Sequence, residues 1–257
     1  MTYYRPRTAA EAVELTTSGV DPAYLAGGHT LIPAMKARLR DPDRLIDVSG
    51  LDELRGMEHA DGRLWIGALT RHADVARGAD VFPALKTMAS MIGDPQVRNR
   101  GTLGGSLANN DPAADYPAAV LALDALVETD RAVHEAADFF QGMFFTALEE
   151  GELIRRVGFR IPRRAAYAKF RHPASRYALA GVFLAELEKG WRVAVTGAGG
   201  EGVFRWSEAE AALGAGQNAR DVPPPDAAAM SSDIHAGADY RAHLCTVMLK
   251  QAVGDLS

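Results

Sequence analysis

The sequence has little of what defines several common classes of protein. It contains one cysteine, Cys245, among 257 residues, so the chain forms no internal disulfide and lacks the four thiolates that usually hold an iron–sulfur cluster. No run approaches the roughly 20 apolar residues that a membrane span needs. Residues 1–7 lack the apolar core of a secretory signal. We therefore expect a cytoplasmic protein with no membrane span.

Positive charge and the usual nucleotide-binding motifs are also scarce. The formal net charge of −5 argues against a nucleic-acid partner, whose phosphates would favour a basic surface. No Gly-x-Gly-x-x-Gly opens a strand–helix unit, and the first glycine pair is not followed by the lysine of a P-loop, so neither site is expected. Four histidines have no spacing typical of a metal site and are expected to be ordinary surface or core residues: His72, His172, His235 and His243.

Two glycine pairs are present, each with polar flanks. The first lies within residues 25–30, directly after a short apolar stretch, and the second lies within residues 102–106. Adjacent glycines permit positive φ angles and close approach to a ligand, so backbone N–H groups and the Thr102 and Ser106 hydroxyls can bind one anion. We interpret both segments as tight pyrophosphate-binding turns on either side of one long ligand. The competing interpretation of either pair alone is a simple turn.

Polar residues beside these segments have two interpretations each. Asp111 and Asp115 suit acid–base catalysis or metal binding, but Asp111 precedes a proline as turn formers do, and no further acids or histidines surround the pair. His29 offers either its imidazole or only its backbone N–H. Arg98 is expected to form buried hydrogen bonds that shape the neighbouring backbone rather than to bind substrate. Lys169, within an expected strand, suits a solvated strand position.

Apolar spacing and helix caps predict an α+β fold. Helices are expected near residues 8–15, 30–39, 70–75, 82–91, 116–123, 204–213 and 236–253. Strands are expected near residues 23–26, 45–48, 64–68, 126–129, 131–134, 167–171, 178–185 and 191–197, with a further pair of strands within 152–162. Chain length and a change of pattern near residue 164 favour two domains, 1–164 and 165–257. The second is expected to hold a three-stranded antiparallel sheet with helices.

The order and separation of these motifs resemble the FAD-binding medium subunits of molybdenum hydroxylases. The resemblance is to the carbon monoxide dehydrogenase flavoprotein and xanthine dehydrogenase FAD-binding subunit type, and it covers essentially the whole chain. It rests on residues 26–30, 96–99, 102–106 and 111–117 and on the late helical stretch 231–244. It implies an FAD-binding domain of the PCMH or vanillyl-alcohol-oxidase type with two α+β subdomains, about 1–55 and 56–164, and then a small C-terminal α+β domain.

The resemblance also implies which residues contact FAD. The two glycine segments would bind the pyrophosphate, Asp115 would contact the cofactor, and Lys169 would lie near the flavin end. Ile92 would stand beside the ring, where the xanthine relatives carry an aromatic. The residues expected at the cofactor are Leu25, Ala26, Gly27, Gly28, His29, Thr30, Leu31, Ile32, Ile92, Thr102, Leu103, Gly104, Gly105, Ser106, Asp115 and Lys169. No catalytic side chain and no metal ligand is expected, since a flavin does its own chemistry.

Partner chains are the last implication of the resemblance. A large subunit would carry the molybdenum cofactor and a small subunit the [2Fe-2S] clusters, in a dimer of heterotrimers, and electrons would pass through FAD to an external acceptor. Two alternatives stay open: a self-contained flavin oxidase and a scaffold subunit without cofactor. The pyrophosphate interpretation predicts that valine at Gly28 or Gly104 enters the cofactor space and abolishes flavin retention while the fold survives.

Overall fold

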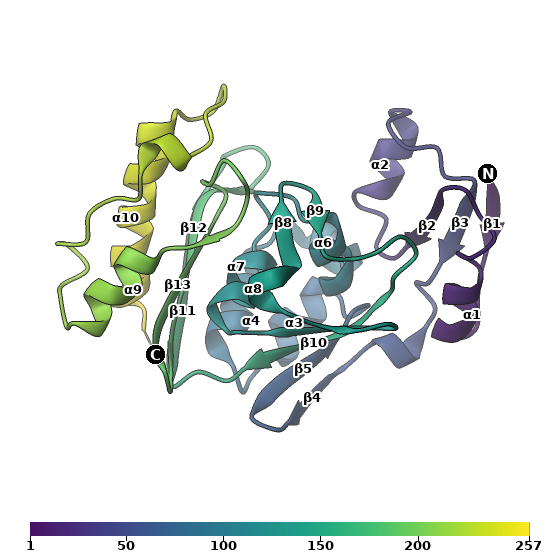
Figure 1. Ribbon diagram of the computed structural model, residues 1–257, viewed down its shortest axis with the longest axis horizontal. Coiled ribbons are helices and arrows are strands. Elements are labelled where there is room, and N and C mark those ends of the chain that lie inside the picture. The colour runs from purple at the N-terminus through teal and green to yellow at the C-terminus, as the bar shows by residue number, and fades with distance from the viewer. Residues whose placement is uncertain (257) are drawn as a thin grey trace.

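The three larger of the four β-sheets follow one another along the long axis of the molecule, and the two chain termini lie toward opposite ends of it (Figure 1). The computed structural model describes residues 1–256. The first sheet is parallel, with the order β1-β3-β2. It contains β1 (Thr2–Tyr4), β2 (Pro22–Leu25) and β3 (Arg44–Asp47), and its connections carry α1 (Ala9–Glu14) and α2 (Leu31–Lys36). The short helix η1 (Asp52–Leu54) follows.

Local sequence explains the two helices of this part. The Thr8 side chain accepts a hydrogen bond from the Glu11 N–H at 3.1 Å, so Thr8 caps α1 as its position predicts. Ala12 and Ile46 are fully buried in the small core between α1 and the sheet. The second helix ends at Lys36 rather than near residue 39, because the chain turns at Arg38, which has a positive φ of 58°.

The second sheet is antiparallel, with the order β4-β5-β10-β6-β7. Its strands are β4 (Met57–Ala60), β5 (Arg63–Gly67), β6 (Leu126–Thr129), β7 (Val133–Glu135) and β10 (Ile154–Arg160). The pair of strands expected within residues 152–162 is wrong: β10 is one strand, and it pairs with β5 on one side and β6 on the other. Residues Val157–Phe159 are buried on both faces of the sheet, so the sequence lacks the alternation of apolar and polar residues that usually indicates a single strand.

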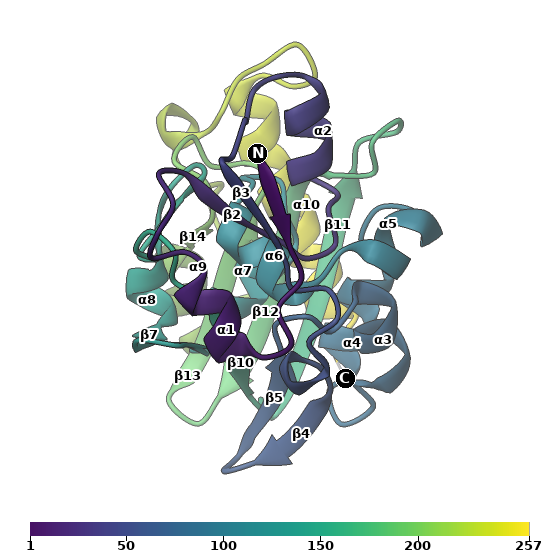
Figure 2. The same cartoon turned by 90° about the vertical axis from the view of Figure 1, so that its right-hand side faces the viewer.

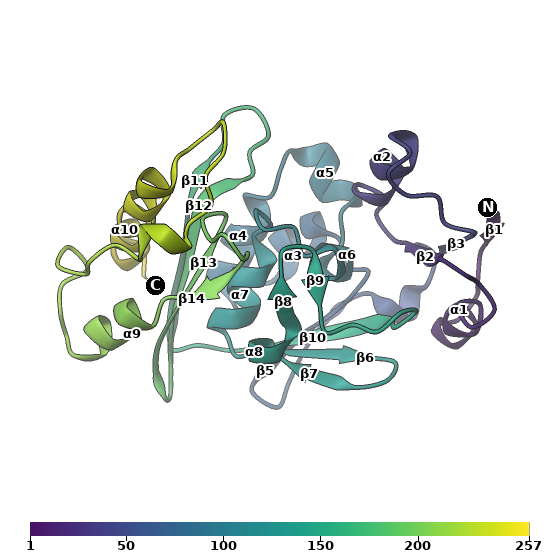
Figure 3. The same cartoon turned by 45° about the horizontal axis from the view of Figure 1, so that its top comes forward.

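Helices between β5 and β6 cover this sheet. They are α3 (His72–Gly78), α4 (Pro83–Ser90), α5 (Pro95–Arg100), α6 (Leu103–Asn109) and α7 (Tyr116–Ala122). All seven residues of α7 are buried, as its almost entirely apolar sequence predicts. After β7 come α8 (Ala136–Phe139) and the hairpin of β8 (Phe140–Gly142) and β9 (Phe145–Thr146), which Figure 3 shows beside α6.

The third sheet is antiparallel and has four strands, not the three expected. It contains β11 (Arg164–Arg171), β12 (Ala178–Leu187), β13 (Gly190–Thr196) and β14 (Phe204–Arg205) in that order. The fourth strand has only two residues and lies just before α9 (Ser207–Gly214). The sequence pattern therefore assigns these two residues to the helix expected over 204–213. The helices η2 (Ala227–Ala229) and α10 (Ala238–Gly254) complete this part.

The third sheet packs on both faces. Helices α4 and α7 lie between it and the second sheet, while α9 and α10 cover its other face (Figures 1 and 2). The largest hydrophobic core accordingly joins Ile66 and Val127 of the second sheet to Tyr167 and Phe183 of the third through helices α4 and α7. The layered arrangement leaves the first sheet on its own side of the second, and the cavity described next lies between them.

Candidate functional site

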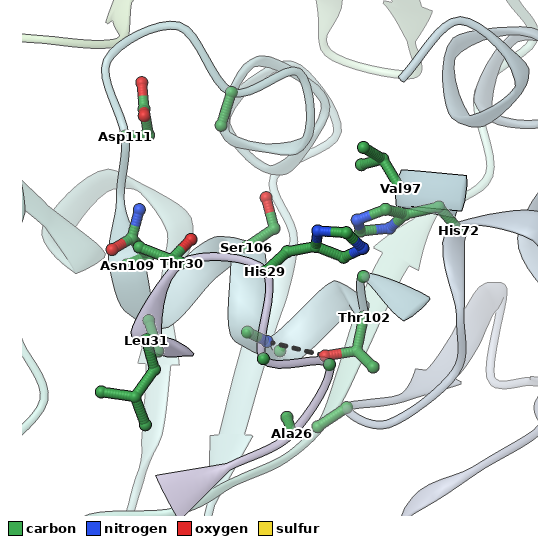
Figure 4. A pocket seen from close by; sticks show the side chains of 18 of the residues that line it. Ala26, His29, Thr30, Leu31, His72, Val97, Thr102, Ser106, Asn109 and Asp111 are labelled. Carbon is green, nitrogen blue, oxygen red and sulfur yellow. Dashed lines mark hydrogen bonds between the residues drawn. The ribbon is translucent and has the colours of Figure 1, made fainter. Parts of the chain in front are cut away.

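A cavity of about 500 Å³ lies where the segment after β2 faces the start of α6 (Figure 4). That volume falls within the range of small-molecule and cofactor sites. The structure brings together most of the residues that the sequence singles out: Ala26, Gly27, Gly28, His29, Thr30, Leu31, Ile92, Thr102, Gly104, Gly105, Ser106 and Asp115 all line it. Four others do not line it: Leu25, Ile32, Leu103 and Lys169.

The first glycine segment is a turn, as predicted. Gly28 has a φ of +75°. A Cβ at this position would lie 3.3 Å from the Leu25 side chain and 3.1 Å from the Ile32 side chain. These two residues therefore support the turn from behind instead of facing the cavity. Among residues 1–256, the backbone N–H groups of Gly28, His29 and Thr30 have no acceptor in the protein. They are the backbone donors that this segment can offer to a ligand.

The second glycine segment is not a turn but the first turn of helix α6, which corrects the sequence prediction. Thr102 is the N-cap, and its Oγ1 accepts a hydrogen bond from Gly105 N–H at 3.2 Å. The N–H of Leu103 donates to Thr70 O at 3.1 Å, and that of Gly104 to Ala68 O at 2.8 Å. The first amides of α6 are therefore already used by the protein. Leu103 is fully buried in the core.

The first glycine segment packs closely against residues 100–101, just before α6, because Gly27 and Gly101 have no side chains there. A Cβ on Gly27 would lie 2.3 Å from the Arg100 carbonyl oxygen and 3.0 Å from Gly101 Cα. A Cβ on Gly104 would lie 2.6 Å from Ala68 Cβ, so a side chain there would point toward the end of β5, although the Gly104 backbone lines the cavity. Gly105 is exposed. Its Cβ would meet the Thr102 hydroxyl at 2.9 Å and Ala26 at 3.9 Å, and so would enter the space between the walls.

One end of the cavity has a buried ion pair behind it. Lys169 Nζ lies 2.8 and 3.0 Å from the two carboxylate oxygens of Asp115 and also donates to Met91 O at 3.0 Å. The Tyr167 hydroxyl donates to the same carboxylate. Burial raises the pKa of Asp115, and Lys169 and Tyr167 oppose that shift. Lys169 is thus neither solvated nor at the cavity surface: it holds Asp115, which is at that surface.

Arg98 shapes the backbone beside the cavity, as expected. Its guanidinium donates to Ile92 O at 2.9 Å and to Gly93 O at 3.1 Å. These bonds fix the position of Ile92, which lines the cavity with an aliphatic rather than an aromatic side chain. Asp111 also lines the cavity, and its Oδ1 accepts from Ala113 N–H at 2.8 Å in the turn that its sequence predicts.

Glu152 is a cavity residue that the sequence does not reveal. It is buried; its Oε1 lies 2.9 Å from His134 Nε2, and Thr129 donates to the same oxygen. Burial opposes its charge, but the hydrogen bonds from His134, Thr129 and the Glu149 N–H lower the pKa of the carboxyl below its ordinary value. Glu152 is therefore an ionised acceptor in the cavity wall. No local signal marks it, since an acid before a strand is common.

Tyr24 and His72 are two further cavity residues that sequence interpretation misses. Tyr24 precedes the first glycine segment, and its hydroxyl donates to Gly151 O at 2.8 Å, joining the first sheet to the segment before β10. His72 begins α3, is 5% exposed and lines the cavity, a position that its sequence context does not indicate. Only the position of Tyr24 beside the glycine segment gave a usable signal.

Comparison with known proteins identifies the family. Residues 1–164 match the family described as "FAD binding domain in molybdopterin dehydrogenase". The chain belongs to the FAD-binding medium subunits of the molybdenum hydroxylases. It is 34% identical to the carbon monoxide dehydrogenase medium chain of Afipia carboxidovorans, over 98% of this chain and 94% of that one. It is also 34% identical to the glyceraldehyde dehydrogenase medium chain of Sulfolobus acidocaldarius, over 93% and 90%.

Solved structures of this medium-subunit family share the fold. Reconstituted carbon monoxide dehydrogenase from Oligotropha carboxidovorans superposes with a TM-score of 0.88 at 32% identity, covering 99% of this chain and 96% of that one. Quinoline 2-oxidoreductase from Pseudomonas putida 86 gives 0.86 at 26% identity, covering 98% and 95%. The resemblance inferred from the glycine segments is therefore confirmed, as is a mixed α+β fold with an FAD-binding domain in residues 1–164. The chain is a medium subunit of multi-subunit dehydrogenases.

Two absences among residues 1–256 bear on other classes of site. Within residues 1–256, no helix has the length and apolar character to cross a membrane. The same residues contain no group of three or more His, Cys, Asp or Glu side chains placed to hold a metal ion.

Proposed function

We propose that the cavity between the first glycine segment and α6 holds FAD, with the pyrophosphate against the free N–H groups of Gly28, His29 and Thr30. The observation that carries this is that three backbone donors without an acceptor belong to residues that line the cavity, together with glycines and small hydroxyl side chains of α6. Such donors bind phosphate oxygens without the steric cost of side chains. The residues present therefore fit the cofactor. One point differs from the sequence interpretation: α6 forms a wall of the cavity but offers no free N–H groups in its first turn.

Different parts of the cavity wall have different chemistry, which suits a long ligand. Asp115 and Ile92 present a carboxylate and an aliphatic surface, whereas Glu152 presents an ionised hydrogen-bond acceptor. We assign the Asp115 and Ile92 end to the flavin, as the family resemblance implies. When bound, FAD supplies the redox chemistry, and this chain binds and orients it.

We further propose that the chain works with two partners. A large subunit with a molybdenum cofactor and a small subunit with [2Fe-2S] clusters would supply electrons, in a dimer of heterotrimers, and an external acceptor would receive them. Matches at full length to medium chains of dehydrogenase complexes support this assignment. The division at residue 164, the subdomains near residue 55, the PCMH-type description and the cytoplasmic location stay predictions.

The first test is the absorption spectrum of the full-length chain, purified alone and with its partner subunits. We expect a yellow protein from which acid releases FAD non-covalently, and no flavin reduction by candidate substrates until the partners are added. Rapid reduction of the isolated chain by a small substrate would favour the flavin oxidase. A colourless protein that takes up no FAD even with its partners would favour the scaffold.

A matched pair of glycine variants tests where the cofactor lies. Gly105→Val is expected to lower FAD affinity at least about tenfold with little loss of stability, because its side chain enters the space between the walls. Gly104→Val is expected to destabilise the fold by several kcal/mol, since its side chain meets Ala68 and its backbone. Thermal unfolding and flavin titration measure the two effects. Equal flavin affinity in Gly105→Val and wild type would contradict the assignment of the cavity.

A further inference from the structure

His72 is the buried titratable side chain of the cavity that the proposed FAD site leaves without a role. The side chain is 5% exposed and lines the cavity, and within the described residues its Nδ1 has no hydrogen-bond partner. The Tyr116 ring lies 5.3 Å away, and its buried hydroxyl also lacks a partner. Figure 4 shows the His72 and His29 side chains on the side of the cavity where Thr102 lies.

His72 is packed directly behind the contact between the first glycine segment and residues 100–101. A Cβ on Gly101 would lie 2.5 Å from His72 Nε2, and Gly101 in turn lies against Gly27. The backbone N–H of His72 donates to Gly101 O at 3.0 Å, which holds the start of α3 against the segment before α6. The imidazole is therefore buried against Gly101, which itself lies against Gly27, the residue before the free N–H groups that we assign to the pyrophosphate.

The charged side chains that line the cavity carry no excess of positive charge, and the half-buried Arg98 behind the wall donates to backbone carbonyls. The cations at its surface are Arg40 and Arg176, both exposed, and the carboxylates at its surface are Asp111, Glu152 and Asp115. Asp115 is paired with Lys169 behind the wall. A pyrophosphate diester brings two negative charges, and backbone N–H groups bind it without supplying a formal positive charge. The site thus lacks a buried counter-charge for its ligand.

We propose that His72 takes up one proton when the pyrophosphate of FAD enters the cavity, and that its imidazolium supplies this counter-charge. The inference rests on the proposed function. An anion beside a buried imidazole favours the charged form. Without the ligand the opposite holds, since burial, the nearby His29 and Arg98 lower the pKa of His72 to about 4.

Among the charged and titratable groups near His72, none other is a buried side chain that can accept a proton. Arg98 is a permanent cation and opposes protonation. Burial raises the pKa of Tyr116, so this hydroxyl stays neutral. His29 lies on the opposite segment and is exposed to solvent, whereas His72 is buried. The proton taken up on binding is therefore assigned to His72, and His29 is the alternative that the experiment must separate.

Calorimetric titration of the flavin-free full-length chain with FAD measures this directly. At pH 6, in two buffers with different enthalpies of ionisation, we expect uptake of about one proton per FAD bound by wild type. His72→Gln should bind FAD with uptake near zero, while His59→Gln, an exposed site outside the cavity, should keep it. Full uptake in His72→Gln that is lost in His29→Gln would overturn the assignment in favour of His29.

The wild-type chain alone gives an independent measurement if the His72→Gln variant fails to fold. A proton taken up on binding makes the Kd for FAD rise about tenfold per pH unit between roughly pH 5 and 7. A Kd that does not change over this range would overturn the inference while leaving the proposed function intact. Absence of FAD binding at every pH would overturn both.

Discussion

Replacing Lys169 with methionine is expected to lower the free energy of unfolding by about 3–5 kcal/mol. The ammonium is completely buried, lies within 3.0 Å of both Asp115 oxygens and Met91 O, and would be replaced by an apolar group of similar length. Asp115 would then be left buried without a counter-charge, with the Tyr167 hydroxyl as its remaining side-chain donor. Thermal unfolding should show a fall in Tm of roughly 6–20 °C.

Two further variants make this result specific to the buried pair. The double variant Asp115→Asn with Lys169→Met removes both charges, and it should recover part of the lost stability. Lys86→Met removes an exposed pair with Asp80, in which the two side chains are 39% and 74% exposed, and should change stability by at most about 1 kcal/mol. If Lys169→Met were as mild as Lys86→Met, the ion pair would not hold Asp115 as described.

Gly27→Ala is expected to reduce FAD affinity about a hundredfold or more and to destabilise the fold. A single methyl group at this position would lie 2.3 Å from the Arg100 carbonyl oxygen, a distance that forces the backbone of one segment away from the other. The free N–H groups after Gly27 would then move relative to α6 and the opposite wall. Flavin titration together with chemical unfolding would measure the two losses.

Gly50→Ala is the matched control, because a Cβ on Gly50 meets only the Arg5 side chain at an ordinary 3.7 Å. We expect Gly50→Ala to retain wild-type flavin affinity and nearly wild-type stability. Retention of flavin by Gly27→Ala at the wild-type level would show that close packing of the first glycine segment against residues 100–101 does not organise the cavity.

Part of the site can be predicted from sequence because glycine residues mark places where the backbone takes a positive φ or packs closely against another segment. The turn at Gly28 follows from its neighbours, and the lining role of Ile92 and Asp115 follows from the family resemblance. The conformation of the second segment cannot be predicted, because a Thr followed by Leu-Gly-Gly suits a helix N-cap and a turn equally well. What decides between them is the partner strand at Ala68 and Thr70, which takes the first amides of α6 and is distant in sequence.

Lys169, Glu152 and His72 show a second limit. Each is a common polar residue whose role depends on burial, and burial arises from packing between parts of the chain that lie far apart. Lys169 meets Asp115 across 54 residues, and Glu152 meets Thr129 across 23. Local composition contains no information about these contacts, so the sequence left Lys169 undecided between solvent and cofactor.

The hydrophobic core that joins the second and third sheets has a consequence for how the molecule unfolds. Residues on both sides of position 164, including Ile66, Val127, Tyr167 and Phe183, bury their side chains together. The match to the FAD-binding domain ends at that position, but the buried surface does not. We therefore expect the second and third sheets, with helices α4 and α7 between them, to unfold together as one cooperative unit that crosses residue 164.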